Sequence, residues 1–210
     1  MKIEQVRPED IERRSFEIIT ELLGERQPSE ETAHIVKRVI HTTADLEYAE
    51  SLYFSENAAQ ILSRALAEGA HIITDTQMAL SGINKKALSV FGGQVHCFMA
   101  DEDVSLQAKK RGVTRACVSM EKAAALSVPL IFAIGNAPTA LLRLDELIRA
   151  GVVIPRLVIG VPVGFVNVVQ SKERIMTAGV PCIVAKGRKG GSNVAAAIIN
   201  AGLYRLAEEK

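Results

Sequence analysis

The segment His34–Thr43 carries the side chains best suited to proton transfer. With a helical period of about 3.6 residues, His34, Arg38 and His41 share one face of a helix. The opposite, apolar face consists of Ile35, Val36, Val39 and Ile40. A helix C-terminus stabilises the imidazolium of His41, whereas the charge of Arg38 opposes it. His41 is therefore a candidate for proton exchange near neutral pH, and an ordinary solvated helix face is the alternative.

The remaining histidines and cysteines indicate no metal site. His71 and His96 lie in or beside apolar runs, so we interpret both as hydrogen-bonded core residues. Cys97, Cys117 and Cys182 lie far apart and form no CxxC pair, and no HxxxH or HExxH spacing occurs. We expect no protein-held metal or other cofactor, and the cysteine pattern favours a reducing cytoplasm. A nucleophilic GxSxG turn is also absent.

Small and polar residues follow four of the predicted strands. They are Asp75, then Gly135-Asn136-Ala137, then Gly160-Val161-Pro162-Val163-Gly164, and finally Lys186-Gly187-Arg188-Lys189-Gly190-Gly191-Ser192. Ligands of open parallel sheets bind beyond the carboxyl ends of the strands, and glycine lets backbone N–H groups approach a ligand closely. Any one of these loops could be a plain strand-to-helix turn. Several on one edge of a sheet predict a binding cleft.

The last of these loops, with Arg188 and Lys189 beside two glycines, invites a phosphate-binding interpretation. It matches neither GxxxxGK[ST] nor GxGxxG, and it follows the last strand, whereas the dinucleotide fingerprint follows the first. A ligand rich in carboxylates would suit the same loop equally well.

Short apolar runs that alternate with helical stretches must position these residues. We expect helices near Gln77–Ser89, Val104–Lys110 with Arg115–Leu126, Pro138–Ala150 and Phe165–Ala178, and Ser29 as the N-cap of the helix that carries His34 and His41. The runs are His71–Thr74, Val95–Phe98, Leu130–Ile134, Leu157–Val161 and Cys182–Ala185. They are continuous, as in strands that are buried on both faces, and the strand–helix alternation implies a parallel sheet with helices on both sides. We predict one domain over residues 1–210, of the α/β class. Its expected architecture is a three-layer, flavodoxin-like sheet of about five strands.

Composition supports a globular chain without an obvious polymeric partner. Its 210 residues are 48% hydrophobic and 23% charged, and the net charge of +1 gives no reason to expect nucleic acid or a membrane surface. The charge-free span Ala123–Leu142 is long enough to cross a bilayer but contains two prolines. We interpret it as a strand, a turn and a helix start. The charged N-terminal residues predict no signal peptide.

Five segments together resemble one enzyme family. They are Arg14–Ile19, Val39–Thr43, Gly135–Leu141, Gly160–Val166 and Gly187–Ser192, which occur in this order from about Arg7 to the C-terminus. The chain resembles the precorrin-8X and cobalt-precorrin-8 methylmutases of cobalamin biosynthesis. The resemblance implies an isomerase that moves a methyl group from C-11 to C-12 of a corrin ring, giving hydrogenobyrinate or cob(II)yrinate. It also implies a homodimer with the tetrapyrrole site at the subunit interface, and no cofactor other than cobalt carried by the substrate.

The resemblance assigns roles to individual residues. The catalytic histidine of the family falls on His41, and ligand-contacting residues fall on Ser15 and Arg115. Asn84 corresponds to a further contact, although Ser81-Gly82-Ile83-Asn84 departs from the His-Gly-Val-Thr of the aerobic-pathway enzyme. Backbone-rich loops suit the flat faces of a macrocycle and cations suit its carboxylate rim. The expected substrate-binding set is Ser15, Arg38, Asn84, Arg115, Gly135, Asn136, Ala137, Gly160, Val163, Gly164 and Arg188.

Two other functions fit the same residues. A flavodoxin-like fold is also compatible with a nucleotide- or flavin-binding protein, because fold does not fix function. A non-catalytic tetrapyrrole carrier would bind the macrocycle without rearranging it. Bound corrin, flavin fluorescence and turnover distinguish these possibilities.

Overall fold

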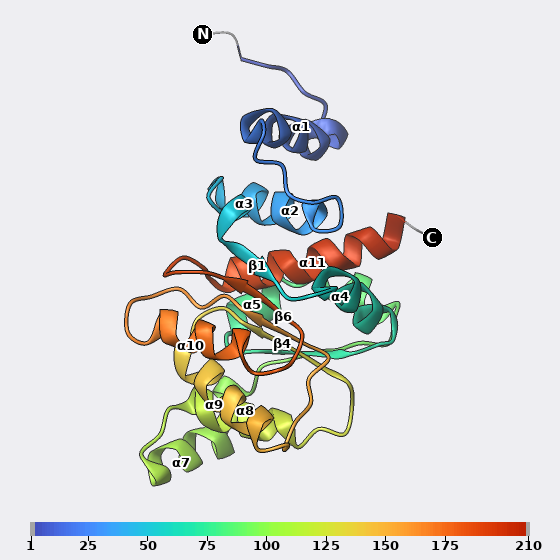
Figure 1. Ribbon diagram of the computed structural model, residues 1–210. Helices are drawn as coiled ribbons and strands as arrows, with labels where there is room; N and C mark the ends of the chain where they lie inside the picture. The colour runs from blue at the N-terminus through green and yellow to red at the C-terminus, as the bar shows by residue number, and fades with distance from the viewer. Residues whose placement is uncertain (1–2, 209–210) are drawn as a thin grey trace.

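A mostly parallel sheet forms the centre of the molecule (Figure 1). The structure is a computed structural model and describes residues 3–208. The six strands in this range are β1 (Leu52–Phe54), β2 (His71–Thr74), β3 (Val95–His96), β4 (Leu130–Ile134), β5 (Leu157–Gly160) and β6 (Cys182–Ala185). Their order is β1-β6-β5-β4-β2-β3, and only the pairing of β1 with β6 is antiparallel. Without β1, the parallel strands follow the flavodoxin-like order, which confirms the predicted fold class.

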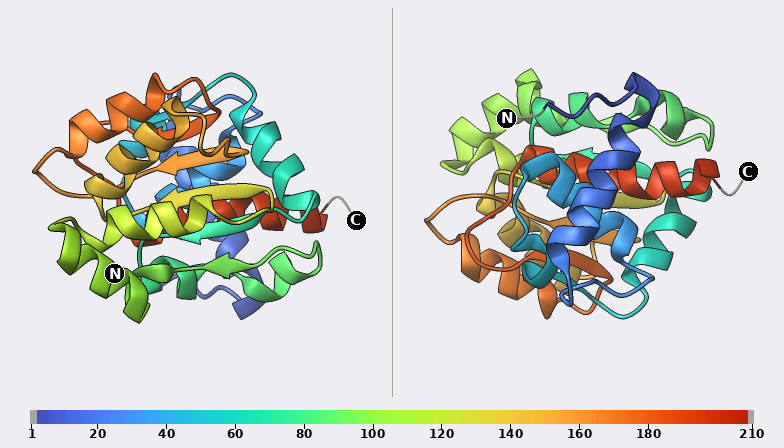
Figure 2. Two further views of the ribbon diagram at one scale, coloured as in Figure 1. Left: turned by 90° about the horizontal axis from the view of Figure 1, so that it is seen from below. Right: turned by 90° about the horizontal axis from the view of Figure 1, so that it is seen from above.

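The helices form the outer layers. They are α1 (Ile11–Leu23), α2 (Ala33–Thr43), α3 (Tyr48–Ser51), α4 (Ala58–Ala67), α5 (Gln77–Gly82), α6 (Lys85–Ser89), α7 (Glu102–Arg111), α8 (Arg115–Ala124), α9 (Pro138–Arg149), α10 (Val168–Met176) and α11 (Ser192–Glu208), with short 3-10 turns at Pro8–Asp10 and Phe98–Ala100. Figure 2 shows α11 crossing one face of the sheet, with α8, α9 and α10 on the other. Helix α1 lies outermost, on α2 (Figure 1).

Two apolar cores separate these layers, because neighbouring strand residues point to opposite faces. Ile131 packs into the core beneath α2, α4 and α11, and the next residue, Phe132, packs into the core beneath α8, α9 and α10. All residues of β4, β5 and β6 are buried, which explains their continuous apolar sequences. Within residues 3–208 no helix is long and apolar enough to span a bilayer, and Ala123–Leu142 folds into the end of α8, β4 and the start of α9.

Four local features differ from the sequence-based expectations. The edge strand β1 was not anticipated, so the sheet has six strands instead of about five. Helix α2 begins at Ala33, because Ser29 forms a preceding turn in which its carbonyl accepts the Thr32 N–H. The single helix expected over 77–89 is two, because Ile83 is extended and the Asn84 side chain caps α6. Helix α10 begins at Val168, which leaves Phe165 in a loop.

Candidate active site

His41 lies in the last turn of α2 and is exposed to solvent. The four aliphatic residues of the opposite face are at most 1% exposed, so the predicted amphipathic pattern of this helix is confirmed. Ala44, in a left-handed conformation with φ of 54°, ends the helix and donates its N–H to the Ile40 carbonyl at 2.7 Å. The His41 imidazole stacks on the ring of Phe16 from α1, with centroids 5.4 Å apart and planes inclined by 28°.

A cavity of about 260 Å³ lies beside His41, with walls from α2, α5 and α11. Its polar lining includes Thr42, Asn193 and Asn200. A second groove of about 350 Å³ runs between α1, α2 and α11. Arg38 and Tyr204 line both hollows, so the two are neighbours. Together the two hollows form a concave surface beside the exposed His41 imidazole, and a ligand can be held there.

Arg38 is engaged within the protein. Its guanidinium lies 4.8 Å from the centroid of the Phe16 ring and 4.9 Å from that of Tyr204, and it pairs with Glu12 of α1. The side chain is 16% exposed. A substrate carboxylate that binds Arg38, as predicted from the sequence, would therefore compete with Glu12.

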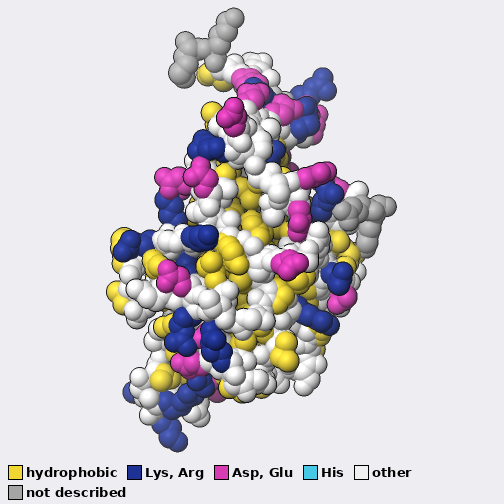
Figure 3. Space-filling model, viewed as in Figure 1, with side chains coloured by type: hydrophobic (Ala, Val, Ile, Leu, Met, Phe, Trp, Pro, Cys, Tyr) yellow, Lys and Arg dark blue, Asp and Glu magenta, His cyan; other side chains and the backbone are white. Residues whose placement is uncertain are grey.

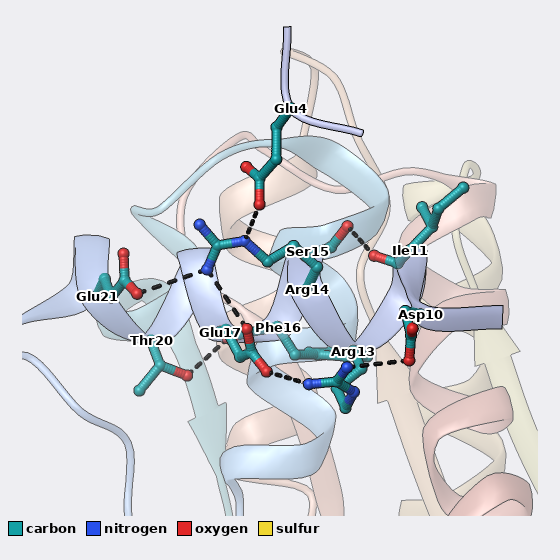
Figure 4. Close-up of polar contacts among 10 residues, drawn as sticks. All are labelled: Glu4, Asp10, Ile11, Arg13, Arg14, Ser15, Phe16, Glu17, Thr20 and Glu21. Atoms are coloured by element: carbon teal, nitrogen blue, oxygen red, sulfur yellow. Dashed lines mark hydrogen bonds and ion pairs between the residues drawn. The ribbon is translucent and has the colours of Figure 1, made fainter. Parts of the chain in front are cut away.

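Ser15 lies on α1, and its hydroxyl is bound to its own helix. Its hydroxyl donates to the Ile11 carbonyl at 2.8 Å (Figure 4). The same figure shows Arg13 and Arg14 joined to carboxylates of the N-terminal segment. The hydroxyl oxygen of Ser15 keeps its lone pairs and can accept a hydrogen bond from a ligand.

Asn84 is joined by a hydrogen bond from its backbone N–H to Asn200, which lines the His41 cavity. The Asn84 N–H donates to Asn200 Oδ1 at 2.8 Å, and Asn200 Nδ2 donates to the Gly82 carbonyl at 2.8 Å. The Asn84 side chain caps α6 by accepting the Ala87 N–H at 3.0 Å.

Two residues that line the His41 cavity, Asn193 and Asn200, were not among the site residues predicted from the sequence. The available signal was two amides in the otherwise apolar, alanine-rich start of α11.

The point where the strand order reverses, between β2 and β4, is filled by Asp75. This carboxylate is 1% exposed and accepts the N–H groups of Gly135, Asn136 and Ala137 at 2.9, 2.8 and 2.5 Å. Burial raises the pKa of the Asp75 carboxyl, while the three N–H donors act in the opposite direction. These backbone N–H groups bind the protein's own carboxylate, so any ligand contact of this loop has to use other atoms.

Glycine at position 135 has a packing reason. A Cβ atom added there would meet the Ser192 Cα at 2.7 Å, so the β4–α9 loop and the start of α11 approach each other through a glycine. Gly160 is inside β5, where an added Cβ would lie 3.3 Å from Leu141. Both glycines are placed by the fold at the sheet edge, and their contacts with a ligand stay predictions.

The loop after β5 presents apolar side chains to solvent. Val163, Phe165 and Val166 are 47%, 85% and 79% exposed. The Gly164 N–H donates to the Arg188 carbonyl at 3.2 Å, which joins this loop to the one after β6. The predicted site residues Val163, Gly164 and Arg188 thus lie together at one edge of the sheet.

A buried lysine holds the loop after β6. Lys172 is 1% exposed, and its Nζ donates to the carbonyls of Gly187 and Lys189 at 2.8 Å each. Burial lowers the pKa of Lys172 to about 8. The Lys189 ammonium binds Asp45 and Glu47, which raises its own pKa and lowers that of Asp45. Arg188 is exposed and has no ion pair among residues 3–208, so its guanidinium can bind an anionic ligand.

Arg115 lies on the other side of the sheet, in the first turn of α8. It is exposed, and its Nη1 donates to the Met99 carbonyl at 3.3 Å. Helix α8 covers the face opposite to α2, so His41 and Arg115 belong to different layers of one chain. Lys109, Lys110 and Arg111 end the neighbouring α7, and Lys and Arg side chains gather at this end of the molecule (Figure 3).

The two remaining histidines bind each other. His71 Nδ1 and His96 Nε2 are 2.9 Å apart, and the rings stack with centroids 5.0 Å apart. Both are half-buried, and burial is the main cause of the lowered pKa of His96. Their interpretation as hydrogen-bonded residues is confirmed, but both are half-buried and so lie outside the core in which they were expected.

Comparison with known proteins gives consistent matches along the chain. The family profile described as Precorrin-8X methylmutase matches residues 10–205. Cobalt-precorrin-8 methylmutase of Salmonella typhimurium is 46% identical over 209 residues, 96% of this chain and 97% of that protein. The Priestia megaterium protein of the same name is 46% identical over 93% of this chain and 87% of its own length. The crystal structure of precorrin-8X methyl mutase from Thermus thermophilus superposes with a TM-score of 0.85 at 37% identity, covering 95% of this chain and 98% of that one.

Proposed function

The chain belongs to the precorrin-8X methylmutase family, and we propose that it moves one methyl group from C-11 to C-12 of its corrin-ring substrate with His41 as the proton donor. As a member of this family it is an isomerase, an intramolecular transferase of cobalamin biosynthesis. The single observation that supports the role of His41 is its placement. An exposed imidazole stands at the end of α2, beside a cavity that is also lined by the Arg38 cation, the hydroxyls of Thr42 and Tyr204 and the amides of Asn193 and Asn200.

Methyl migration makes modest demands on the protein. The bond from the methyl carbon to C-11 breaks as the bond to C-12 forms, so the substrate and the product contain the same atoms. No co-reactant and no water are consumed. A proton placed on the macrocycle by His41 would draw electron density from the ring and ease the migration, and its return to His41 restores the enzyme. Fixing the ring beside the imidazole supplies the rest.

The flat ring and its carboxylate rim match two kinds of surface at the sheet edge. The exposed apolar side chains of Val163, Phe165 and Val166 suit the ring face. Arg188, which has no ion pair within residues 3–208, suits a rim carboxylate. Ser15, Arg38 and Asn84 complete the proposed contacts around His41.

We propose that Arg115 reaches the ring from a second copy of the chain in a homodimer. In one chain Arg115 and His41 belong to opposite layers, so a single ring does not easily touch both. Outward-facing Ile11, Ile18 and Leu22 on α1, which are 54%, 36% and 58% exposed, provide apolar surface for such an association.

We further propose a cobalt-containing substrate, no cofactor of the enzyme itself and a cytoplasmic location. The two sequence relatives described above are both cobalt-precorrin-8 methylmutases, which supports the first point. The metal would arrive inside the macrocycle as part of the substrate. Turnover of metal-free and cobalt-containing precursor, measured side by side, tests this choice.

The buried Asp75 disfavours the alternative of a flavin- or nucleotide-binding protein. In flavodoxin-like folds the anionic ligand binds at the point where the strand order reverses, on backbone N–H groups and a helix N-terminus. Here those N–H groups already donate to Asp75. A phosphate at the same place would meet a carboxylate that is 1% exposed.

His41→Asn tests the proposed role of the imidazole. General acid catalysis contributes about 10²–10⁴ in rate, so the variant should lose that much turnover while keeping most of its affinity for the product. His34→Asn, on the same helix face but two turns earlier, is the matched control and should change turnover little. Near wild-type turnover by folded His41→Asn protein would remove His41 from the chemistry. Loss of turnover together with loss of product affinity would assign it to binding instead.

A further inference from the structure

The His41 imidazole is exposed yet has one defined neighbour. Its ring lies 5.4 Å from that of Phe16, centroid to centroid, and the planes are inclined by 28°. Phe16 belongs to α1, which is separated from α2 in sequence by the loop that follows Leu23. An exposed side chain samples several rotamers, and a stacked partner favours one of them. Aromatic pairs of this kind shift such an equilibrium by about two- to tenfold.

The Phe16 ring is itself held in place by a side chain of another helix. The Arg38 guanidinium lies 4.8 Å from the Phe16 ring centroid, and the same guanidinium lies 4.9 Å from the ring of Tyr204 on α11. Glu12, one helical turn before Phe16 on α1, pairs with Arg38. The Phe16 ring is therefore held by Arg38 of α2, and the Arg38 side chain is in turn held by Tyr204 of α11 and Glu12 of α1.

This arrangement separates two tasks on one helix face. Arg38 holds α1 through Glu12 and the Phe16 ring, and His41, one turn further along α2, uses the same ring as a support. The cavity beside His41 remains open, because Phe16 does not line it. The imidazole is thus oriented from one side and accessible from another, as a group that exchanges a proton with a bound ring must be.

We propose that Phe16 is a positioning residue for His41, fixing the plane of the imidazole that meets the macrocycle. The inference rests on the proposed function, in which His41 is the proton donor. It assigns a task to a residue that otherwise counts only as packing between α1 and α2.

Two measurements on Phe16→Leu test the proposal. Leucine keeps an apolar contact with α2 but removes the ring. Turnover of the precursor should fall about three- to tenfold in kcat with KM unchanged, because orientation and not binding is lost. In NMR spectra, the His41 ring protons should lose the ring-current shift caused by Phe16. The chain has four histidines, so His41→Asn identifies these signals by their disappearance.

Two further variants separate positioning from packing. Phe16→Tyr keeps the ring and should retain both kcat and the shifted signals. Ile19→Val is the matched control, because Ile19 is a 7%-exposed residue of the same helix whose loss of a methylene weakens α1 packing without touching the stack. It should leave kcat and the His41 signals unchanged.

Several results would overturn the inference. One is a wild-type NMR spectrum in which the His41 signals are not shifted, a result that does not depend on the folding of any variant. Another is a Phe16→Leu protein with unchanged kcat. An equal loss of kcat in Ile19→Val would reduce Phe16 to packing. If His41→Asn is inactive while Phe16→Leu is fully active, only the inference about Phe16 fails. If His41→Asn remains active, the proposed function itself fails.

Discussion

Replacing Asp75 by Asn tests whether the carboxylate at the sheet edge holds the β4–α9 loop. The side chain is 1% exposed and accepts three backbone N–H groups, one on Oδ1 and two on Oδ2. Asparagine has nearly the same shape but only one oxygen. In its better orientation the oxygen keeps the Asn136 and Ala137 N–H groups, and the NH₂ group faces the N–H of Gly135.

The expected cost follows from this count. A buried donor left without an acceptor costs about 1–3 kcal/mol, and two charge-assisted bonds become neutral ones, each weaker by about 1 kcal/mol. Relief from burying a charge offsets part of this loss. We expect Asp75→Asn to lower the free energy of unfolding by about 2–4 kcal/mol, and Asp75→Ala, which leaves three donors unpaired, to lower it further.

Urea unfolding at pH 7, followed by circular dichroism, measures the effect. For a chain of this size about 1 kcal/mol corresponds to roughly 2–4 °C in Tm, so the melting temperature should fall by about 4–16 °C. Asp101→Asn is a suitable control, because that carboxylate binds the Lys122 ammonium near the surface, where an ion pair is worth about 0–1 kcal/mol. A loss below about 1 kcal/mol for Asp75→Asn would show that the three N–H groups are satisfied in another way.

Three further outcomes are expected. Arg115→Ala should weaken binding of the product about ten- to a hundredfold by isothermal titration while leaving Tm unchanged, because a charge-assisted hydrogen bond is lost; unchanged affinity would leave Arg115 as a surface residue. Burial lowers the pKa of Lys172 to about 8, so above pH 8 the unfolded chain binds more protons than the folded one. Stability relative to Lys172→Met should therefore rise between pH 8 and about pH 10.5, by up to about 3 kcal/mol, and a flat difference in denaturant midpoints would contradict the assigned burial. Light scattering should give a dimer at assay concentration, and a fully active monomer would refute the composite site.

Local sequence periodicity predicted the elements that depend on neighbouring residues. The amphipathic face of α2 is a matter of spacing within one helix, and the five parallel strands are marked by continuous apolar runs. Strand β1 carries no such mark. It has three residues, and it is a strand only because Leu52 to Phe54 pair with Ala185 to Ile183, more than a hundred residues later.

The surroundings of His41 depended on tertiary contacts that no spacing reveals. Phe16 is in the sequence motif that suggested the family, yet its stacking on His41 requires α1 to fold back over α2. Tyr204 and Asn200 come from the last helix, and their place beside Arg38 and Asn84 follows from the way α11 crosses the sheet. Asp75 was visible as a polar residue after a strand. That it would bind the loop after β4 depended on β4 being the spatial neighbour of β2.

The β6–α11 loop links the point where the strand order reverses, which Asp75 fills, to the open cavity beside His41. The hydroxyl groups of Ser192 and Thr76 share a hydrogen bond, with their oxygens 2.7 Å apart, and the Ser192 backbone lies close to Gly135. Ser192 therefore packs against the point where the strand order reverses. The next residue, Asn193, lines the cavity of His41. The usual N–H donors of a flavodoxin-like sheet are bound to Asp75, and the hollow beside His41 is lined by side chains of α2, α5 and α11. A surface made by helix side chains suits a large flat ring better than a narrow phosphate-binding turn does, because it can be wide and can be completed by a second chain.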